Sequence, residues 1–382
     1  MKKLIMSLMF MVLICIALPA MAQNSIESNK GSADQKPGGV KSLEKRIKQL
    51  EEAIDRNVES DKWYDRIQVS GLVEVEAGYS KFEDNNDPTA DTDESDVDLA
   101  TVELVVDAKI IKHVDGHVMF KYEQDDLFVD EGFITLVGTE AFPAYLIAGR
   151  QYIPFGYYDS HFVTDPNTLV LGETNQGAAV AGYRFGGGMV DLAVGAFNGE
   201  VDKAGEDNAI DSFVAAVTIQ PLYFLMAGMS YTSNLSSSDS LSAAIEDIGV
   251  TELNDLVGGW SAFVTVEFLD RFKVIVEYVA AVDDFEAGEL YDTTDTQKRK
   301  PTAWNIELGV MIIEDLELAL RYGGSDDGAD FLPESQYGAV VNWGFFKNTS
   351  LALEYLHDEF EETSLAVDQE ADTFTAQLAV EF

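Results

Sequence analysis

Cysteine is almost missing from this sequence of 382 residues, in which Cys15 is the single example. It lies in residues 1–22, which contain two lysines, an apolar run and a small-residue cleavage site at Ala20 to Ala22, the pattern of a secretory signal peptide. The apolar run is short for a membrane anchor, so we expect cleavage before Gln23. The mature chain would then contain no cysteine, which excludes disulfides and thiolate metal sites.

Basic residues are scarce as well. The sequence has 25 Lys and Arg against 68 Asp and Glu, and without Lys2 and Lys3 its formal charge is −45. A nucleic-acid partner requires a basic surface that binds phosphates, so this composition excludes one. The charge favours cations as partners, or contact with an anionic lipid surface bridged by divalent cations.

Long apolar runs are lacking after the signal, so no later segment predicts a membrane-spanning helix. From Arg66 onward, apolar and polar residues instead alternate with the period of two that is typical of strands. The clearest such segments are 67–79, 100–110, 118–122, 190–196, 260–268, 272–280, 304–312, 316–322, 351–355 and 374–382. Weaker runs near Phe133, Tyr145, Tyr183, Phe213, Tyr223 and Tyr337 bring the expected number of strands to sixteen.

The connections between these strands alternate in length. Short turns are expected at 113–116, 139–143, 186–188, 220–222, 270–271, 313–315 and 344–348, and longer loops at 81–97, 152–177, 198–211, 232–256, 282–301, 323–334 and 357–372, with a short exception at 125–126. Short turns at one end and long loops at the other are typical of outer-membrane barrels. Aromatic residues at strand ends and the terminal Phe382 fit the same fold, whereas a soluble β-sandwich explains none of them. We therefore predict an all-β membrane protein, a 16-stranded antiparallel transmembrane β-barrel over residues 66–382, in the outer membrane of a Gram-negative cell envelope and in contact with its lipid.

Residues between the signal and the barrel lack the strand period. Residues 23–39 are polar and predict a flexible linker. Within residues 40–58, Leu43, Ile47, Leu50 and Ile54 form an apolar seam at helical spacing. The seam covers about two heptads and would be marginal as an isolated helix in water. It therefore predicts either a periplasmic coiled coil that assembles a homotrimer or a single helix across the barrel entrance.

The loop from Tyr152 to Gly177 differs from the other long loops because it is apolar and aromatic rather than acidic. Because so much apolar surface is unfavourable when exposed to water, we predict that this loop folds into the mouth of the barrel and narrows it. The loop contributes the candidate constriction residues Tyr152, Pro154, Phe155, Gly156, His161, Asp165 and Glu173. His161 fits either contact with a ligand or an ordinary loop position.

Charged residues within the strands should point into the lumen, since an Arg or Lys facing lipid at mid-depth costs roughly 2–4 kcal/mol. The candidate pore-lining residues on the strands are Glu103, Asp107, Arg150, Arg184, Glu267, Glu307 and Arg321. One interpretation is that these residues only hydrate the lumen. The other is that Arg150 and Arg184, on the two strands that flank the long loop, face acids across the lumen and create a transverse field at a constriction.

Patterns for metal binding and catalysis are weak or missing. The acidic residues of the first long loop, 83–96, lack the glycine and terminal glutamate of a calcium loop, so we expect a solvated loop. The four histidines are scattered, with neither a His-Glu-x-x-His pattern nor a nucleophile elbow. We expect no enzyme activity, no metal site and no cofactor.

Three stretches resemble a known family: Ala148-Gly149-Arg150-Gln151-Tyr152-Ile153-Pro154-Phe155-Gly156, Thr164-Asp165-Pro166, and Leu171-Gly172-Glu173-Thr174. Together with the N-terminal helical segment and the first strand they resemble the LbtU-type siderophore porins, which are associated with uptake of the iron carrier legiobactin. This resemblance implies a sixteen-stranded barrel with a periplasmic coiled coil that passes a ferric siderophore without an energy-coupling plug. Phosphate-selective porins share a helical leader and a Gly-Arg…Pro-Phe-Gly stretch, but an anion-selective pore requires Lys and Arg rings.

The sequence thus leaves several functions open. The first hypothesis is an outer-membrane porin that passes a ferric siderophore by energy-independent diffusion through an acidic, loop-constricted lumen. The alternative is a general cation-preferring or phosphate-selective-like diffusion porin. A third class, an adhesive surface protein, depends only on the long acidic loops.

Overall fold

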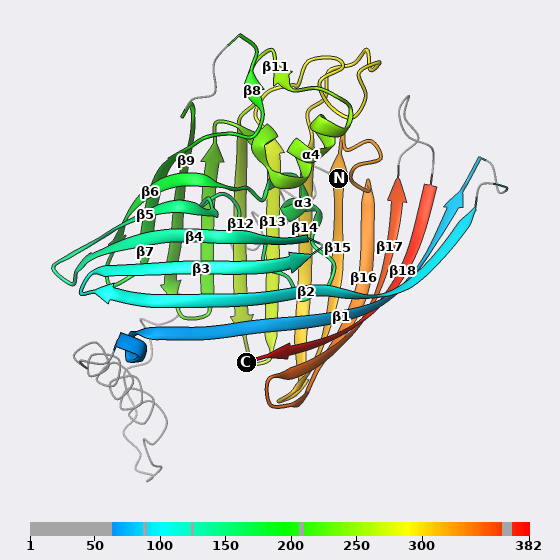
Figure 1. Ribbon diagram of the computed structural model, residues 1–382. Coiled ribbons are helices and arrows are strands. Elements are labelled where there is room, and N and C mark those ends of the chain that lie inside the picture. Colours follow the sequence, from blue (N-terminus) through cyan, green and yellow to red (C-terminus); the bar gives the residue numbers. More distant parts are fainter. Residues whose placement is uncertain (1–62, 87–88, 90, 124–125, 206–209, 361–368) are drawn as a thin grey trace, which may run out of the picture. The chain divides into compact units, whose positions relative to one another are not determined.

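A closed barrel of sixteen antiparallel strands forms the body of this computed structural model (Figure 1). The structure describes residues 63–382 except 87–88, 90, 124–125, 206–209 and 361–368. Each strand is hydrogen-bonded to its neighbours in the chain, and β1 closes the barrel by pairing with β18. Within the described residues, no helix has both the length and the apolar character that a membrane crossing requires.

The strands of the barrel are 8 to 20 residues long. They are β1 Ile67–Asp84, β2 Thr92–Ile111, β3 Val114–Glu123, β4 Asp126–Thr139, β5 Phe142–Tyr152, β6 Asn175–Phe185, β7 Val190–Phe197, β9 Ser212–Leu222, β10 Leu225–Thr232, β12 Gly259–Phe268, β13 Phe272–Ala281, β14 Thr302–Ile313, β15 Leu316–Asp326, β16 Ser335–Phe346, β17 Thr349–Phe360 and β18 Gln369–Glu381. The other elements are η1 Trp63–Arg66, α3 Asn167–Gly172, η2 Leu235–Ser237, α4 Asp239–Asp247, and the parallel pair β8 Asp202–Lys203 and β11 Glu252–Leu253.

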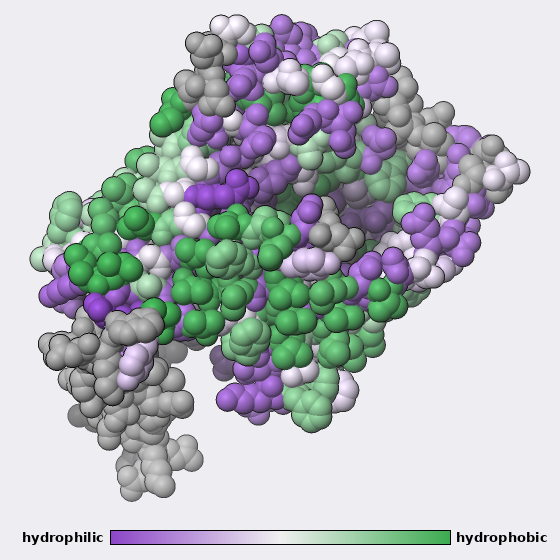
Figure 2. Space-filling model, in the orientation of Figure 1, coloured by the Kyte–Doolittle hydropathy of each residue, from purple (hydrophilic) through white to green (hydrophobic). Residues whose placement is uncertain are grey.

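Side chains alternate along each strand between the lumen and the outside. The outward positions are largely apolar and exposed, as at Leu104, Val194, Met229 and Leu320. Figure 2 shows such side chains gathered across the lower front wall, over β1 to β4, with hydrophilic ones above them at the mouth. Exposed apolar surface of this extent requires an apolar solvent, which acyl chains provide. The predicted membrane barrel is confirmed.

Aromatic side chains form a girdle at the end of the barrel with the long loops. Neighbouring strands contribute pairs whose ring centroids are about 5 Å apart: Trp260 with Tyr278, Trp304 with Tyr322, and Tyr355 with Phe374. Amphipathic rings at this level suit the boundary between acyl chains and head groups. At the opposite end Phe268 stacks on Phe272 across a short turn.

The predicted alternation of short turns and long loops is also confirmed. The first hairpin differs in detail, because β1 continues to Asp84 and β2 begins at Thr92. Most of the acidic stretch expected in a loop is therefore paired strand, with Lys81 opposite Asp93 and Tyr79 opposite Ser95. Charged, exposed strands can extend beyond the membrane because water, rather than lipid, surrounds them. The predicted signal peptide (1–22), linker (23–39) and trimer-forming helix (40–58) lie outside the described residues.

Gly71 extends the pairing of β1 with β18 by contacts with Phe382. The main-chain N–H of Gly71 donates to the carbonyl of Phe382, and the N–H of Phe382 donates to the carbonyl of Gly71, both at 3.1 Å. A β-carbon at Gly71 would lie 2.4 Å from the Phe382 ring and 2.6 Å from the carbonyl oxygen of Glu103. The terminal ring thus occupies the space that a side chain would need.

A Gly71→Val substitution should therefore weaken closure. We expect it to lower the free energy of unfolding by roughly 1–3 kcal/mol, the usual effect of overpacking. Urea unfolding of the refolded barrel in detergent, followed by tryptophan fluorescence, measures this. Gly78→Val on the same strand is the control, because a β-carbon there meets no atom within 4 Å. Equal midpoints for the two variants would contradict the account.

Candidate functional site

The loop between β5 and β6, residues 153–174, lies inside the barrel, as the sequence predicts. Its main chain contacts lumen-facing side chains on the wall formed by β10 and β13 to β17. The first contact is from the N–H of Gly156 to the Ser230 hydroxyl, at 2.9 Å. Figure 1 shows α3, which belongs to this loop, within the barrel and α4 above it at the mouth. The loop thus occupies one side of the lumen.

Three buried glutamates on this wall hold the loop through its backbone. Glu277 accepts the N–H groups of Tyr157 and Tyr158 at 2.7 and 3.0 Å. Glu354 accepts the N–H of Val163 at 2.6 Å. Glu307 accepts the N–H of His161 at 2.7 Å. Hydrogen bonds to a carboxylate are about twice as strong as neutral ones, and here they satisfy donors that the loop would otherwise leave buried without partners.

Glu307 is also paired with Arg321, and neither side chain is exposed to solvent. The Arg321 Nε donates to Glu307 at 3.0 Å, and one of its terminal nitrogens donates to the Ser160 hydroxyl at 2.7 Å. The guanidinium lies 4.3 Å from the centre of the Phe162 ring. Each partner therefore compensates the buried charge of the other, and both contact the loop.

The far end of the loop reaches toward the short-turn end of the barrel. The His161 Nδ1 lies 3.0 Å from Glu317, and the His161 carbonyl accepts from the Asn342 amide at 2.8 Å. Asp159 forms an ion pair with Lys273 at 2.5 Å. His161, a candidate for ligand contact, is thus a buried part of the loop anchorage.

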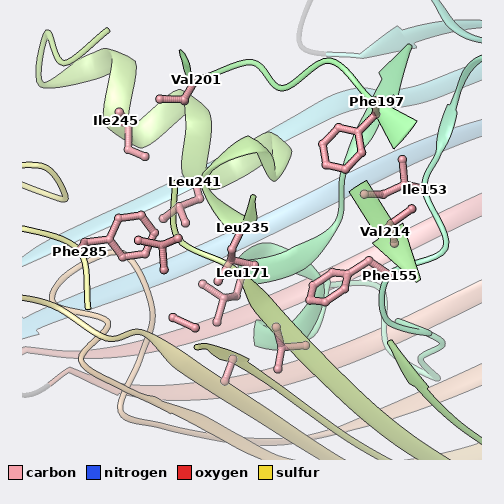
Figure 3. Packing of buried hydrophobic residues seen from close by; sticks show 14 of the residues in the cluster. Ile153, Phe155, Leu171, Phe197, Val201, Val214, Leu235, Leu241, Ile245 and Phe285 are labelled. Carbon is pink, nitrogen blue, oxygen red and sulfur yellow. The ribbon is translucent and has the colours of Figure 1, made fainter. Parts of the chain in front are cut away.

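A folded cap covers the loop from the extracellular side. Loops after β7, β10 and β13 join the constriction loop in one apolar cluster, in which Phe155 and Leu171 contribute the constriction-loop side and Leu235, Leu241 and Phe285 the cap side (Figure 3). Ile153, Phe155 and Leu171, from the stretches that carry the family resemblance, belong to this core. Gly156 belongs there as well, since its φ is +77° and a β-carbon would lie 2.1 Å from the Tyr158 ring. Phe155, Gly156 and Leu171 therefore determine how the loop folds, whereas Asp165 and Glu173 of the same stretches border the passage.

The passage that remains is bordered by the loop on one side and by β1 to β4 on the other. On the loop side, Thr164 and Asp165 are exposed and Glu173 is partly buried. The register of the opposite wall directs a mostly acidic set of side chains into the lumen: Glu74, Glu76, Glu103, Asp107, Lys121, Glu123 and Glu131. The Lys121 ammonium is already paired with Glu123 at 3.1 Å. The narrow part of the lumen is therefore acidic on both sides.

Glu173 shows the effect of this charge. It lies on the loop, outside the membrane-spanning strands. Burial, followed by the Asp165 and Asp239 carboxylates, raises the pKa of Glu173 to about 8, and Lys121 opposes the shift. A carboxyl group that ionises in the neutral range makes the charge of the passage dependent on pH.

The interpretation in which Arg150 and Arg184 both face acids across the lumen is wrong, because the strand register directs only Arg184 inward. Arg150 pairs with Gly132 and Gly177 near the extracellular rim. Alternate residues of β5 point to the same face, so Arg150 lies on the outer face together with exposed Leu146. Arg184 does face inward, but it pairs with Asp191 at 3.1 Å beside the turn between β6 and β7. The two arginines thus lie near opposite ends of the barrel and on opposite faces.

Tyr152, at the end of β5, donates to Asp130 at 3.2 Å and lines a cleft of the loop together with Glu173. Of the other strand candidates, Glu103, Asp107, Glu267, Glu307 and Arg321 face inward. Glu307 and Arg321 are beneath the loop and not open to the passage. Asp107 instead pairs with His117 at 2.8 Å.

Sequence reasoning overlooked Glu354, Ser230 and Asn342 as loop contacts. The sequence marks each of these contacts only as an isolated polar residue at an inward-facing strand position. Residues that contact only water in the lumen have the same pattern. Across the described ranges, no group of three or more His, Cys, Asp or Glu side chains is placed to hold a metal ion.

Glu307→Ala should release the loop. It removes the acceptor for His161 and Ser160 and leaves the Arg321 charge buried without its partner, a change that typically costs about 3–5 kcal/mol. We expect a larger and noisier single-channel conductance in planar bilayers. Glu381→Ala, which removes a lumen-facing acid at the periplasmic end of β18, is the matched control. A quiet current of unchanged size in Glu307→Ala would show that the loop is held by other contacts.

No protein-family model matches this chain. It is 24% identical over 367 residues to a UPF0422 protein of Legionella pneumophila, covering 83% of this chain and 66% of the relative, and 24% identical over 310 residues to a UPF0422 protein of Coxiella burnetii, covering 77% and 64%. The chain thus spans just under two thirds of the length of these relatives.

Among solved structures, the chain is similar to the outer membrane channel DcaP of Acinetobacter baumannii, with a TM-score of 0.57, 16% identity, and coverage of 83% of this chain and 97% of that one. It is also similar to an anion-selective porin from Comamonas acidovorans, with a TM-score of 0.60, 10% identity, and coverage of 83% and 99%. Identities this low establish the fold alone. The chain has the porin fold, and the predicted outer-membrane location is confirmed.

Proposed function

We propose that this protein is a passive diffusion porin of the outer membrane that prefers cationic solutes. The observation that supports this proposal is the distribution of charge at the constriction. Asp165 and Glu173 on the loop face an opposite wall with Glu103 and Glu123, where Lys121 is already paired. A narrow, water-filled passage between two acidic surfaces lowers the energy of a passing cation and raises that of an anion.

Ion selectivity tests the proposal. The reversal potential of the purified channel in a KCl gradient should indicate a cation-to-anion permeability ratio above one. An anion-selective channel would contradict it and favour the phosphate-selective alternative. A steady open conductance also separates a channel from an adhesive surface protein.

The selectivity should increase with pH because of Glu173. Its pKa of about 8 leaves Glu173 largely neutral below about pH 7 and charged above about pH 9. One added charge about 4 Å from a cation contributes roughly 1 kcal/mol in water, so the ratio should rise by up to about five-fold. The Glu173→Gln variant should lose this rise. A wild-type ratio that is constant over this range would contradict the assignment.

A ferric siderophore is the second candidate solute, and it depends on the resemblance of residues 148–156, 164–166 and 171–174 to siderophore porins. Because these residues mainly build the loop and the cap, they support a channel architecture more directly than a particular solute. An acidic passage would favour neutral or cationic ferric complexes over anionic ferric carboxylates. Uptake of iron-labelled complexes of each charge, in cells with and without this protein, tests this candidate. Equal uptake in the two strains would reject it.

A further inference from the structure

The two arms of the constriction loop enclose a cleft of about 490 Å³. One arm enters from β5 and contributes Phe155, Tyr157 and Asp159, and the other returns to β6 and contributes Leu169 and Glu173. A volume of this size is within the range of small-molecule sites. The cleft belongs to the loop that narrows the lumen, so an occupant would obstruct the passage.

Aromatic and apolar groups form much of its lining. The Tyr157 ring stacks on Phe263 of the barrel wall, with centroids 4.4 Å apart and an angle of 11° between the ring planes. Phe263 covers one face of this partly buried ring, and Tyr157 is among the residues that line the cleft. The backbone of Tyr157 is fixed by Glu277, so the ring is held in place. Such a surface suits the apolar body of a ligand and the face-on approach of a cation.

The charges in the cleft are unbalanced. Asp159 is neutralised by Lys273 and also accepts from the Tyr157 hydroxyl at 3.3 Å. Glu173, in contrast, is influenced by the carboxylates of Asp165, Asp239 and Asp130, and by Lys121 as the opposing charge. Lys121 is paired with Glu123, and Arg150 is a counter-charge of Asp239, so the carboxylates around Glu173 still outnumber the cations.

We propose that this cleft binds an organic cation, with its ammonium group at Glu173 and its apolar body against Tyr157, Phe155 and Leu169. This inference depends on the proposed preference for cations and specifies the solute class. An inorganic ion would gain little from the aromatic lining, and a neutral apolar molecule would leave the carboxyl group without a counter-charge. A ligand that combines an amine with a ring or alkyl body uses both features.

Block of the potassium current by 2-phenylethylammonium at pH 9, where Glu173 is ionised, tests the inference, with 2-phenylethanol as the neutral analogue of similar shape. The amine should block wild-type channels in a concentration-dependent manner and the alcohol should not. Glu173→Gln should weaken the block by about ten-fold. Tyr157→Leu, which keeps the main-chain anchor, should weaken it by roughly two- to five-fold. The amine should block the Glu381→Gln variant, changed at the periplasmic end of the lumen, as strongly as it blocks the wild type.

The outcomes separate this inference from the proposed function. A cation-selective channel in which amine and alcohol act alike would overturn the binding site and leave the selectivity intact. Full block in Glu173→Gln would likewise overturn it, because the ammonium would then bind elsewhere. A channel without cation preference in simple KCl would reject the proposed function, whatever the amine does.

Discussion

The interior of this barrel depends on hydrogen bonds that the N–H groups of the loop donate to buried carboxylates of the wall. A loop inside a water-filled lumen must satisfy its backbone donors and must resist being displaced by water. Glu277, Glu307 and Glu354 satisfy these donors from three different strands, and Arg321 compensates the charge of Glu307. The apolar cap then closes over the loop from the other side. The position of the passage follows from these two attachments.

This arrangement divides the acidic residues of the lumen into two populations. The first is buried beneath the loop and stabilises it, so its charge interacts mainly with protein groups. The second, which includes Glu103 and Asp165, borders the remaining passage and acts on solutes. A count of lumen-facing acids would therefore overestimate the charge that a solute meets. The free acids still exceed the available cations at the narrow part, and this excess is the basis of the proposed preference for positive solutes.

Much of the architecture was predictable from the sequence, because lipid outside and water inside impose a period of two on most strands. Which residues of β5 face the lumen was not predictable. Tyr145 and Ile147 face inward and Leu146 faces outward, so both faces of this strand are apolar at these positions. Without a polar face, periodicity does not distinguish the lumen from the lipid, and Arg150 was assigned to the wrong side. The anchoring roles of Glu277 and Glu307 also could not be separated from simple hydration, since that difference depends on which distant backbone meets each carboxylate.

The central claim is that the loop forms one side of an acidic passage inside the barrel. Because Cys15 is the single cysteine of the sequence, an Asp165→Cys substitution introduces one reactive thiol into the mature barrel. Modification rates with cationic and anionic methanethiosulfonate reagents then report both access and local potential at this position. The account predicts that the thiol reacts, and that the cationic reagent is faster by roughly ten-fold. An unreactive thiol, or a faster reaction with the anionic reagent, would contradict it.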